Sequence, residues 1–196
     1  VPNYVDASGY TRELRARSKV GDDNTQVELA IYDIKKDTAY MVKTDMLPGI
    51  KDLPDYVKDY PDKTWEKVER EVILSSADFS PKGDKAIVNV RSKDNKDRWI
   101  ALMDLTDGSL KSLDRQRDEA WIAGPGIGWS FGGGTLGWLD NSTIYFQSET
   151  SGYSHLYLLD VATGKKTDLT PGDYEVFDPF LSKDKKSWFL TTSQEG

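Results

Sequence analysis

The sequence has no cysteine and only one histidine, His155. The missing thiols exclude disulfide bonds, cysteine-ligated zinc and a cysteine nucleophile, and a single imidazole excludes any site that needs two. Positive charge is also scarce, because 26 Lys and Arg stand against 33 Asp and Glu, a net charge of −7. A broad nucleic-acid surface needs clustered positive charge, so nucleic acid is not an expected partner. No apolar run approaches the roughly 18 residues of a membrane span.

Aromatic residues, in contrast, are plentiful. The 196 residues include six Trp, ten Tyr and six Phe. A disordered chain rarely carries so much aromatic mass, so we expect a packed fold. The length suffices for one core-bearing domain or two small ones.

The two ends of the sequence indicate that this chain is a piece of a longer protein. The chain opens at Val1 without a basic start or an apolar signal core, and it closes at Gly196 directly after a strand-like run. We therefore expect that the absence of a catalytic residue from this chain says little about the parent protein.

Short runs rich in Val, Ile, Tyr, Trp and Phe predict a series of β-strands. Gly, Asn and Asp residues typical of hairpin turns separate these runs. The predicted strands cover residues 27–33, 38–42, 85–91, 98–105, 143–148, 155–161 and 186–192.

A repeated pattern of an apolar residue, a turn and a strand occurs at 79–88, 138–146 and 180–189. Second hairpins follow at 99–108 and 156–164. Such a repeat is typical of β-propeller blades, because one four-stranded sheet cannot cover both of its faces and neighbouring blades do so. The predicted fold is all-β, a partial β-propeller of about four blades of four-stranded antiparallel sheet.

We interpret residues 1–196 as a fragment of one propeller domain. Residues 45–70 break the strand pattern with three prolines and many charges, which indicates an inter-blade excursion. Within and just after it, residues 63–72 are compatible with a short helix. An arc of blades leaves open sheet edges, so a homodimer or strand swapping is also expected.

Three sequence segments resemble the propellers of dipeptidyl peptidase IV-type proteins. Residues 146–157, FQSETSGYSHLY, resemble the signature SE-x-x-G-x-x-HLY, and residues 169–176, LTPGDYEV, are similar to the run LT-x-G-x-W-x-V. Residues 17–29 are similar to a run R-Y-P-K-A-G-x-x-N-P-x-V-x-L that comes earlier in that family. Thr25 and Tyr174 replace the usual Pro and Trp. The segments follow the family's order.

This resemblance implies the N-terminal propeller of a serine peptidase of the prolyl oligopeptidase superfamily. In that family the propeller covers a separate α/β-hydrolase domain, absent from this chain, and filters access to its catalytic Ser, Asp and His. The implied function is a substrate-gating and docking segment, with peptide substrates and the C-terminal hydrolase domain as partners. The implied location is periplasmic or secreted, and no cofactor or metal is implied. A non-enzymatic, TolB-like propeller that binds protein partners is the alternative.

Residues 128–132 match the nucleophile motif G-x-S-x-G and would make Ser130 a nucleophile. The motif needs a strand before it and a helix after it, whereas glycine-rich sequence flanks it here. The only candidate base, His155, follows 25 residues later inside a predicted hairpin, too soon for a hydrolase sheet. We predict no catalytic residue in this chain. A small hydrolase that uses Ser130 is a third hypothesis, and we interpret His155 as a half-buried strand residue.

The glycine-rich segment 124–134 has two interpretations. Glycines allow an innermost strand to bend near the propeller axis. Alternatively the segment is a loop that faces the central cavity, and by family resemblance Phe131, with its neighbour Trp129, would contact the substrate. The aromatic residue of the family is accompanied by an Arg that this segment lacks. Glu119 lies on a charged rim and is the third candidate, for a substrate amine or the catalytic domain.

Overall fold

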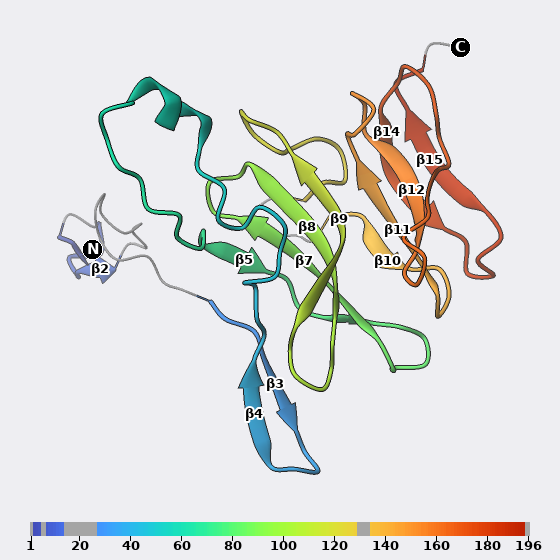
Figure 1. The fold of residues 1–196 in the computed structure, drawn as a ribbon, viewed down its shortest axis with the longest axis horizontal. Helices are drawn as coiled ribbons and strands as arrows, with labels where there is room; N and C mark the ends of the chain where they lie inside the picture. The colour runs from blue at the N-terminus through green and yellow to red at the C-terminus, as the bar shows by residue number, and fades with distance from the viewer. Residues whose placement is uncertain (1, 5–6, 14–26, 129–133, 195–196) are drawn as a thin grey trace.

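A computed structural model describes residues 2–4, 7–13, 27–128 and 134–194 (Figure 1). Two antiparallel sheets make up its centre. The first blade consists of β5 (Val72–Leu74), β6 (Asp78–Phe79), β7 (Ala86–Ser92), β8 (Asp97–Met103) and β9 (Leu110–Arg117). The second blade consists of β10 (Leu136–Trp138), β11 (Thr143–Ser148), β12 (His155–Asp160) and β13 (Lys166–Asp168).

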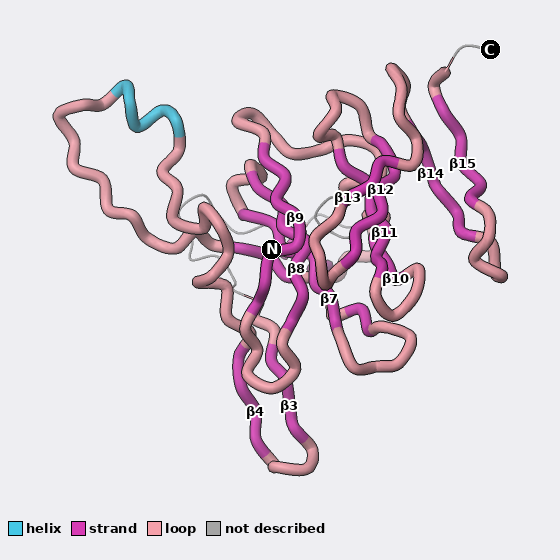
Figure 2. Tube along the Cα trace, turned by 45° about the vertical axis from the view of Figure 1, so that its right-hand side comes forward, coloured by secondary structure: helices cyan, strands magenta, loops and turns pink. Residues whose placement is uncertain are grey.

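Three hairpins accompany the blades. They are β1 (Pro2–Asn3) with β2 (Arg12–Glu13), β3 (Ala30–Asp33) with β4 (Thr38–Met41), and β14 (Val176–Leu181) with β15 (Trp188–Thr192). The β3–β4 hairpin lies beside the first blade, and β14–β15 lies beside the second (Figures 1 and 2). The all-β prediction is confirmed, and every strand predicted from the sequence overlaps an observed one.

Strands β7 and β8 are buried on both faces, because their alternate side chains enter two different apolar clusters. Side chains of Val88, Val90, Trp99 and Ala101 pack in one cluster, together with Leu47 of the segment after β4. The neighbouring positions enter the other cluster, which joins the two blades. Its buried members are Ile87 and Ile100 of the first blade and Trp138, Ile144, Phe146, Tyr157, Leu159 and Val161 of the second blade and the turn after it.

The helix expected at residues 63–72 is wrong. Residues 64–71 have no regular secondary structure, and a short 3-10 helix lies earlier, at η1 (Asp55–Asp59). The extended path is fixed at its end by tertiary contacts, because the Arg70 N–H donates to the Ile50 carbonyl (2.9 Å) instead of to a helical partner. Figure 2 shows the segment 45–70 leading away from the sheets.

An aromatic cluster holds this excursion together. The rings of Tyr56, Tyr60 and Trp65 pack edge to face with centroids 5.8–6.5 Å apart. Among the described residues no helix is long and apolar enough to cross a membrane.

The β14–β15 hairpin exposes aromatic side chains, because within the described chain it is a two-stranded sheet. Phe180 and Phe189 pair across it and are each 62% exposed. The expected homodimer, which would cover such an edge, stays a prediction.

The inter-blade cluster predicts a large effect of truncation at Ile87. An Ile87→Ala variant should lose about 2–5 kcal/mol of unfolding free energy, because the methyl groups removed leave a cavity between two sheets. Urea unfolding followed by near-UV circular dichroism measures the loss. Ile34→Ala, at a position 85% exposed, serves as the control and should change stability by less than about 0.5 kcal/mol. Equal stability of the two variants would contradict the assigned core.

Candidate functional site at the polar end of the blades

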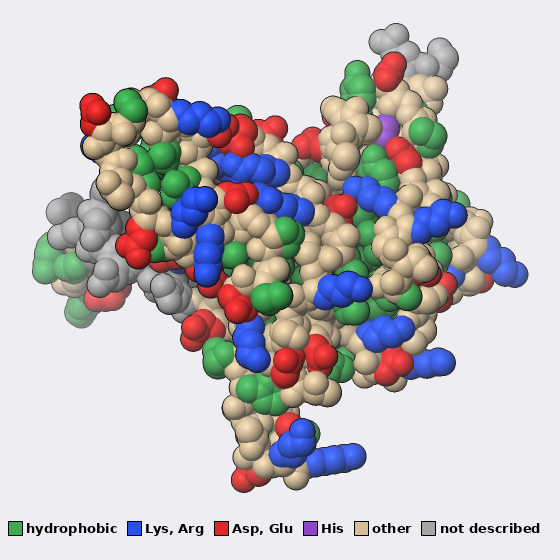
Figure 3. All heavy atoms as spheres, viewed as in Figure 1, with side chains coloured by type: hydrophobic (Ala, Val, Ile, Leu, Met, Phe, Trp, Pro, Cys, Tyr) green, Lys and Arg blue, Asp and Glu red, His purple; other side chains and the backbone are tan. Residues whose placement is uncertain are grey.

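Buried polar side chains gather at one end of the two blades. Apart from Ser80, every buried polar or charged residue in the described part of the chain lies where β7, β9 and β11 finish and where β8 and β12 begin. We call this region the polar end. In Figure 3 basic and acidic side chains lie next to one another along the upper rim of the first blade.

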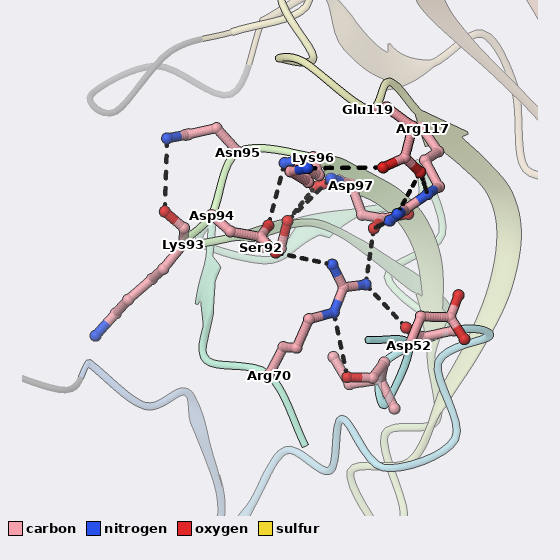
Figure 4. A network of polar contacts seen from close by, with 12 residues as sticks. Asp52, Arg70, Ser92, Lys93, Asp94, Asn95, Lys96, Asp97, Arg117 and Glu119 are labelled. Atoms are coloured by element: carbon pink, nitrogen blue, oxygen red, sulfur yellow. Dashed lines mark hydrogen bonds and ion pairs between the residues drawn. The ribbon is translucent and has the colours of Figure 1, made fainter. Parts of the chain in front are cut away.

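A buried carboxylate, Asp97, is the centre of the first blade's polar end (Figure 4). Its side chain is fully buried and receives hydrogen bonds from Arg70 Nη2 (2.7 Å), Arg115 Nε (2.7 Å) and Arg117 Nη1 (2.5 Å). Its own backbone N–H donates to Ser92 Oγ (2.9 Å). Three guanidinium groups around one carboxylate satisfy the buried negative charge and leave positive charge over.

An outer ring of carboxylates balances that excess charge. Asp94 pairs with Arg70 (3.1 Å), Asp52 with Arg115 (2.8 Å), and Glu119 with Arg117 (2.5 Å). The hydrogen bond from Arg115 holds the pKa of the Asp52 carboxyl below its usual value. Asp52 therefore stays ionised to a lower pH than an ordinary aspartate.

Trp99 forms the floor of this cluster. Its ring lies 5.6 Å from the Arg70 guanidinium and 6.0 Å from that of Arg115, and its Nε1–H donates to the Pro48 carbonyl (3.0 Å). The same few side chains thus join β8, β9 and both ends of the 45–70 excursion.

On the other face of the first blade, Arg91 and Arg98 lie opposite each other on β7 and β8. Arg91 donates to the carbonyls of Ile122 and Gly128. Arg98 Nη1 donates to the backbone carbonyl of Gln147 in the second blade (2.9 Å). These bonds tie the first blade to the second and to the glycine-rich segment.

The second blade holds the same segment from its other side. Ser154 Oγ donates to the Pro125 carbonyl (2.6 Å), and the buried Gln147 side chain accepts from Thr135 Oγ1 (2.6 Å) and donates to the Val176 carbonyl (2.8 Å). Gly134 has φ +67°, and a Cβ there would lie 2.3 Å from the Gly126 carbonyl oxygen. Buried side chains of the second blade therefore bind the residues on both sides of 129–133.

His155 is fully buried, which differs from the half-buried position expected. Its Nε2–H donates to the Tyr174 carbonyl (3.1 Å), while Nδ1 lies 3.0 Å from Ser151 Oγ and 3.2 Å from Asp168 Oδ2. A serine-protease triad needs the nucleophile and the carboxylate on opposite ring nitrogens. Here both meet Nδ1, so this trio does not form a catalytic triad.

A cleft of about 310 Å³ opens at the polar end between the two blades. Its walls are Arg115, Gln116, Arg117, Asp118, Ile122, Ser148, Glu149 and Thr150. Burial raises the pKa of the Glu149 carboxyl above its usual value, and the carboxylates of Glu175 and Asp118 raise it further. Across the described residues, no group of three or more His, Asp or Glu side chains is arranged to hold a metal ion.

The structure tests the predicted site residues only in part. Trp129, Ser130 and Phe131 lie outside the described residues. Glu119 is part of the outer ring, where its carboxylate pairs with Arg117 and with Lys96 (3.6 Å). Its role towards a substrate stays a prediction.

Sequence reasoning missed the residues at the centre of the polar end. Asp97, Arg91 and Arg98 flank an apparent hairpin turn, where charge is normally solvated. The available signal was the length of the apolar runs, because strands buried on both faces leave little room for solvated charge at their ends.

The whole chain matches one protein family. Residues 1–195 match the family model described as the dipeptidyl peptidase IV (DPP IV) N-terminal region. Two curated relatives from Aspergillus fumigatus strains, both named "Probable dipeptidyl peptidase 4", are 28% identical over 200 residues, covering 98% of this chain and 23% of each relative. The chain thus spans about a quarter of the length of these relatives.

Solved structures show the fold. A candidate dipeptidyl aminopeptidase IV from Bacteroides ovatus aligns with a TM-score of 0.61 and 13% identity, covering 99% of this chain and 29% of that one. This similarity confirms the predicted partial propeller. TolB from Acinetobacter baumannii aligns over 66% of this chain and 29% of its own, with a TM-score of 0.40 and 19% identity. At that score the similarity carries no argument about function.

The buried carboxylate gives a direct stability test. An Asp97→Asn variant should lose about 3–5 kcal/mol of unfolding free energy, because three guanidinium groups would then face a neutral amide. Chemical denaturation measures the loss. Asp45→Asn, at an exposed position, should stay within about 0.5 kcal/mol of the wild type. A loss at Asp97 as small as that of the control would show that the arginines are not held by its charge.

The raised pKa of Glu149 predicts that replacing this residue by Gln stabilises the fold in a pH-dependent way. A carboxyl with a higher pKa in the folded state than its ordinary 4.5 destabilises the fold as the pH rises through that folded pKa. Glu149→Gln should therefore be more stable than the wild type at pH 7, and the difference should vanish as the pH falls to about 4.5. Thermal unfolding across this range measures it, with exposed Glu66→Gln as the control. A gap that widens at low pH would contradict the prediction.

Proposed function

The chain belongs to the family of dipeptidyl peptidase IV N-terminal regions, and we propose that it is a propeller segment that gates a longer serine peptidase. In this proposal its polar end docks against the parent's α/β-hydrolase domain and directs peptides towards it. The observation that carries the proposal is the gathering of buried polar groups at one end of both blades.

Buried polar networks are costly unless they are satisfied, so a fold without use for them would keep apolar residues there. At the polar end they bind the Pro125 and Gly128 carbonyls before residues 129–133, and Gln147 accepts from Thr135 Oγ1 after them. Binding residues are often carried on a segment whose ends are held by a rigid scaffold.

We propose Trp129 and Phe131 as the peptide contacts on this loop. An aromatic ring binds a peptide side chain through apolar contact and does not need a charged partner. Glu119 is a weaker candidate for a substrate amine, because such an amine would compete with Arg117 and Lys96 for its carboxylate.

The chemical step belongs to the parent's hydrolase domain in this proposal. Acyl transfer needs a serine that is hydrogen-bonded to a histidine, and the histidine must in turn be hydrogen-bonded to an acid. His155 is unsuited to this role, because it is buried and its Nε2–H is engaged by the Tyr174 carbonyl. This chain contributes access and orientation, and the parent cleaves peptides near a free amino terminus.

The sequence of the complete protein is the first test. We expect a second G-x-S-x-G motif placed between a strand and a helix, followed in order by Asp and His. If the complete protein holds further blades and no hydrolase domain, the gating proposal fails. The TolB-like alternative, a propeller that binds protein partners, then accounts for the fold.

A kinetic test addresses the loop itself. In the complete protein, Phe131→Ala should raise KM for dipeptidyl substrates roughly 10-fold with little change in kcat, because the contact is made equally in the ground and transition states. Tyr56→Ala, which removes an exposed aromatic side chain from the excursion, is the control. Unchanged KM in Phe131→Ala would show that the loop does not touch the substrate.

A further inference from the structure

We infer that Arg91 and Arg98 form a binding site for a single chloride-sized anion at the seam between the two blades. The two residues are a direct cross-strand pair of β7 and β8, so their side chains leave the sheet on the same face. That face is the one that Ile87 and Ile100 turn towards the second blade.

Both guanidinium groups are buried and retain an unused donor. Arg98 is 0% and Arg91 is 8% exposed. Arg98 Nη2 and Arg91 Nε have no hydrogen-bond partner. The other donors bind neutral oxygens, such as Asn89 Oδ1 (2.9 Å), Gln116 Oε1 (3.2 Å) and the Ile122 carbonyl. An unsatisfied buried donor on a charged group is strongly unfavourable.

Negative charge is missing at this place. Among the described residues, no carboxylate forms an ion pair with Arg91 or Arg98. The carboxylate of Asp114 acts on Arg98 through its charge, but its oxygens already accept from Lys166 Nζ (2.9 Å) and Gln116 Nε2 (2.9 Å). Residues 129–133, WSFGG, include no acid. Within the part of the chain that the structure describes, the positive charge of this pair therefore has no ion-pair partner.

The contrast with Asp97 shows what the pair lacks. On the opposite face of the same two strands, three arginines surround a buried carboxylate. Arg91 and Arg98 have the same charge and burial without that carboxylate. A bound anion would supply it and accept the two unused donors.

The surroundings favour a small monovalent anion. Gln116 and Ile122, whose oxygens accept from Arg98 and Arg91, also line the wall of the cleft between the blades. Asp118 and Glu149 line the same cleft and repel a polyanion such as phosphate more strongly than a monovalent anion. The complete burial of Arg98 favours a monatomic ion over a carboxylate ligand.

Thermal unfolding of the chain at constant ionic strength, with chloride replacing gluconate, tests the site. Chloride should raise Tm by about 3–5 °C for each tenfold increase above its Kd, because it binds only the folded chain. Bromide should act in the same way. A Tm that depends on ionic strength alone would overturn the proposal and leave water as the partner of the unused donors.

Two variants assign the effect to this pair. Arg98→Met should lose the chloride dependence of Tm, whatever its stability in gluconate, because the guanidinium group that would bind the anion is gone. Lys111→Met removes an exposed charge from β9 and should keep the full dependence. Chloride dependence that survives in Arg98→Met would overturn the assignment.

Crystals soaked in bromide give a readout that does not depend on the variant folding. The anomalous signal should place one bromide in contact with both guanidinium groups. Bromide at other surface positions only, with none at the pair, would overturn the proposal.

Discussion

The burial of Asp97 is the constraint on which much of the described structure depends. A carboxylate with no exposed surface at the start of β8 requires positive partners, and the chain supplies them from the excursion through Arg70 and from β9 through Arg115 and Arg117. These contacts fix where the excursion ends and how far β9 extends. The path of residues 64–70 therefore follows from a charge several strands away, which explains why its local sequence is a poor guide.

Buried charges on the two faces of the β7–β8 pair have different partners. Asp97 faces the excursion and is surrounded by arginines, whereas its chain neighbour Arg98 faces the second blade and contacts neutral oxygens. This alternation follows from the period of a strand, since adjacent residues point to opposite faces. Adjacent charged residues at the end of a strand that is buried on both faces therefore bind two different neighbouring elements.

The sequence was sufficient to predict seven of the fifteen described strands and the blade repeat, because alternation and turn residues are local signals. The sequence was insufficient where contacts between segments far apart in the chain determine the local structure. The helix expected at 63–72 gave way to the contact between Arg70 and the Ile50 carbonyl. The polar end was also missed, because Arg91, Arg98 and Gln147 meet only when two blades pack, and each alone is typical of a solvated strand end. Trp129 and Phe131 were predicted as substrate contacts from the family resemblance, because no local sequence pattern identifies them.

The seam between the blades combines apolar and directional contacts, and this combination bears on function. Apolar packing around Ile87 and Phe146 brings the sheets together but tolerates small shifts. Hydrogen bonds from Arg98 to the Gln147 carbonyl and from Ser154 to the Pro125 carbonyl have fixed directions and set the relative position of the blades at one end. Gln147 and Ser154 of this seam also bind residues on either side of 129–133, at Thr135 and Pro125. A propeller fold alone implies no particular function, so a function has to be argued from specific contacts such as these.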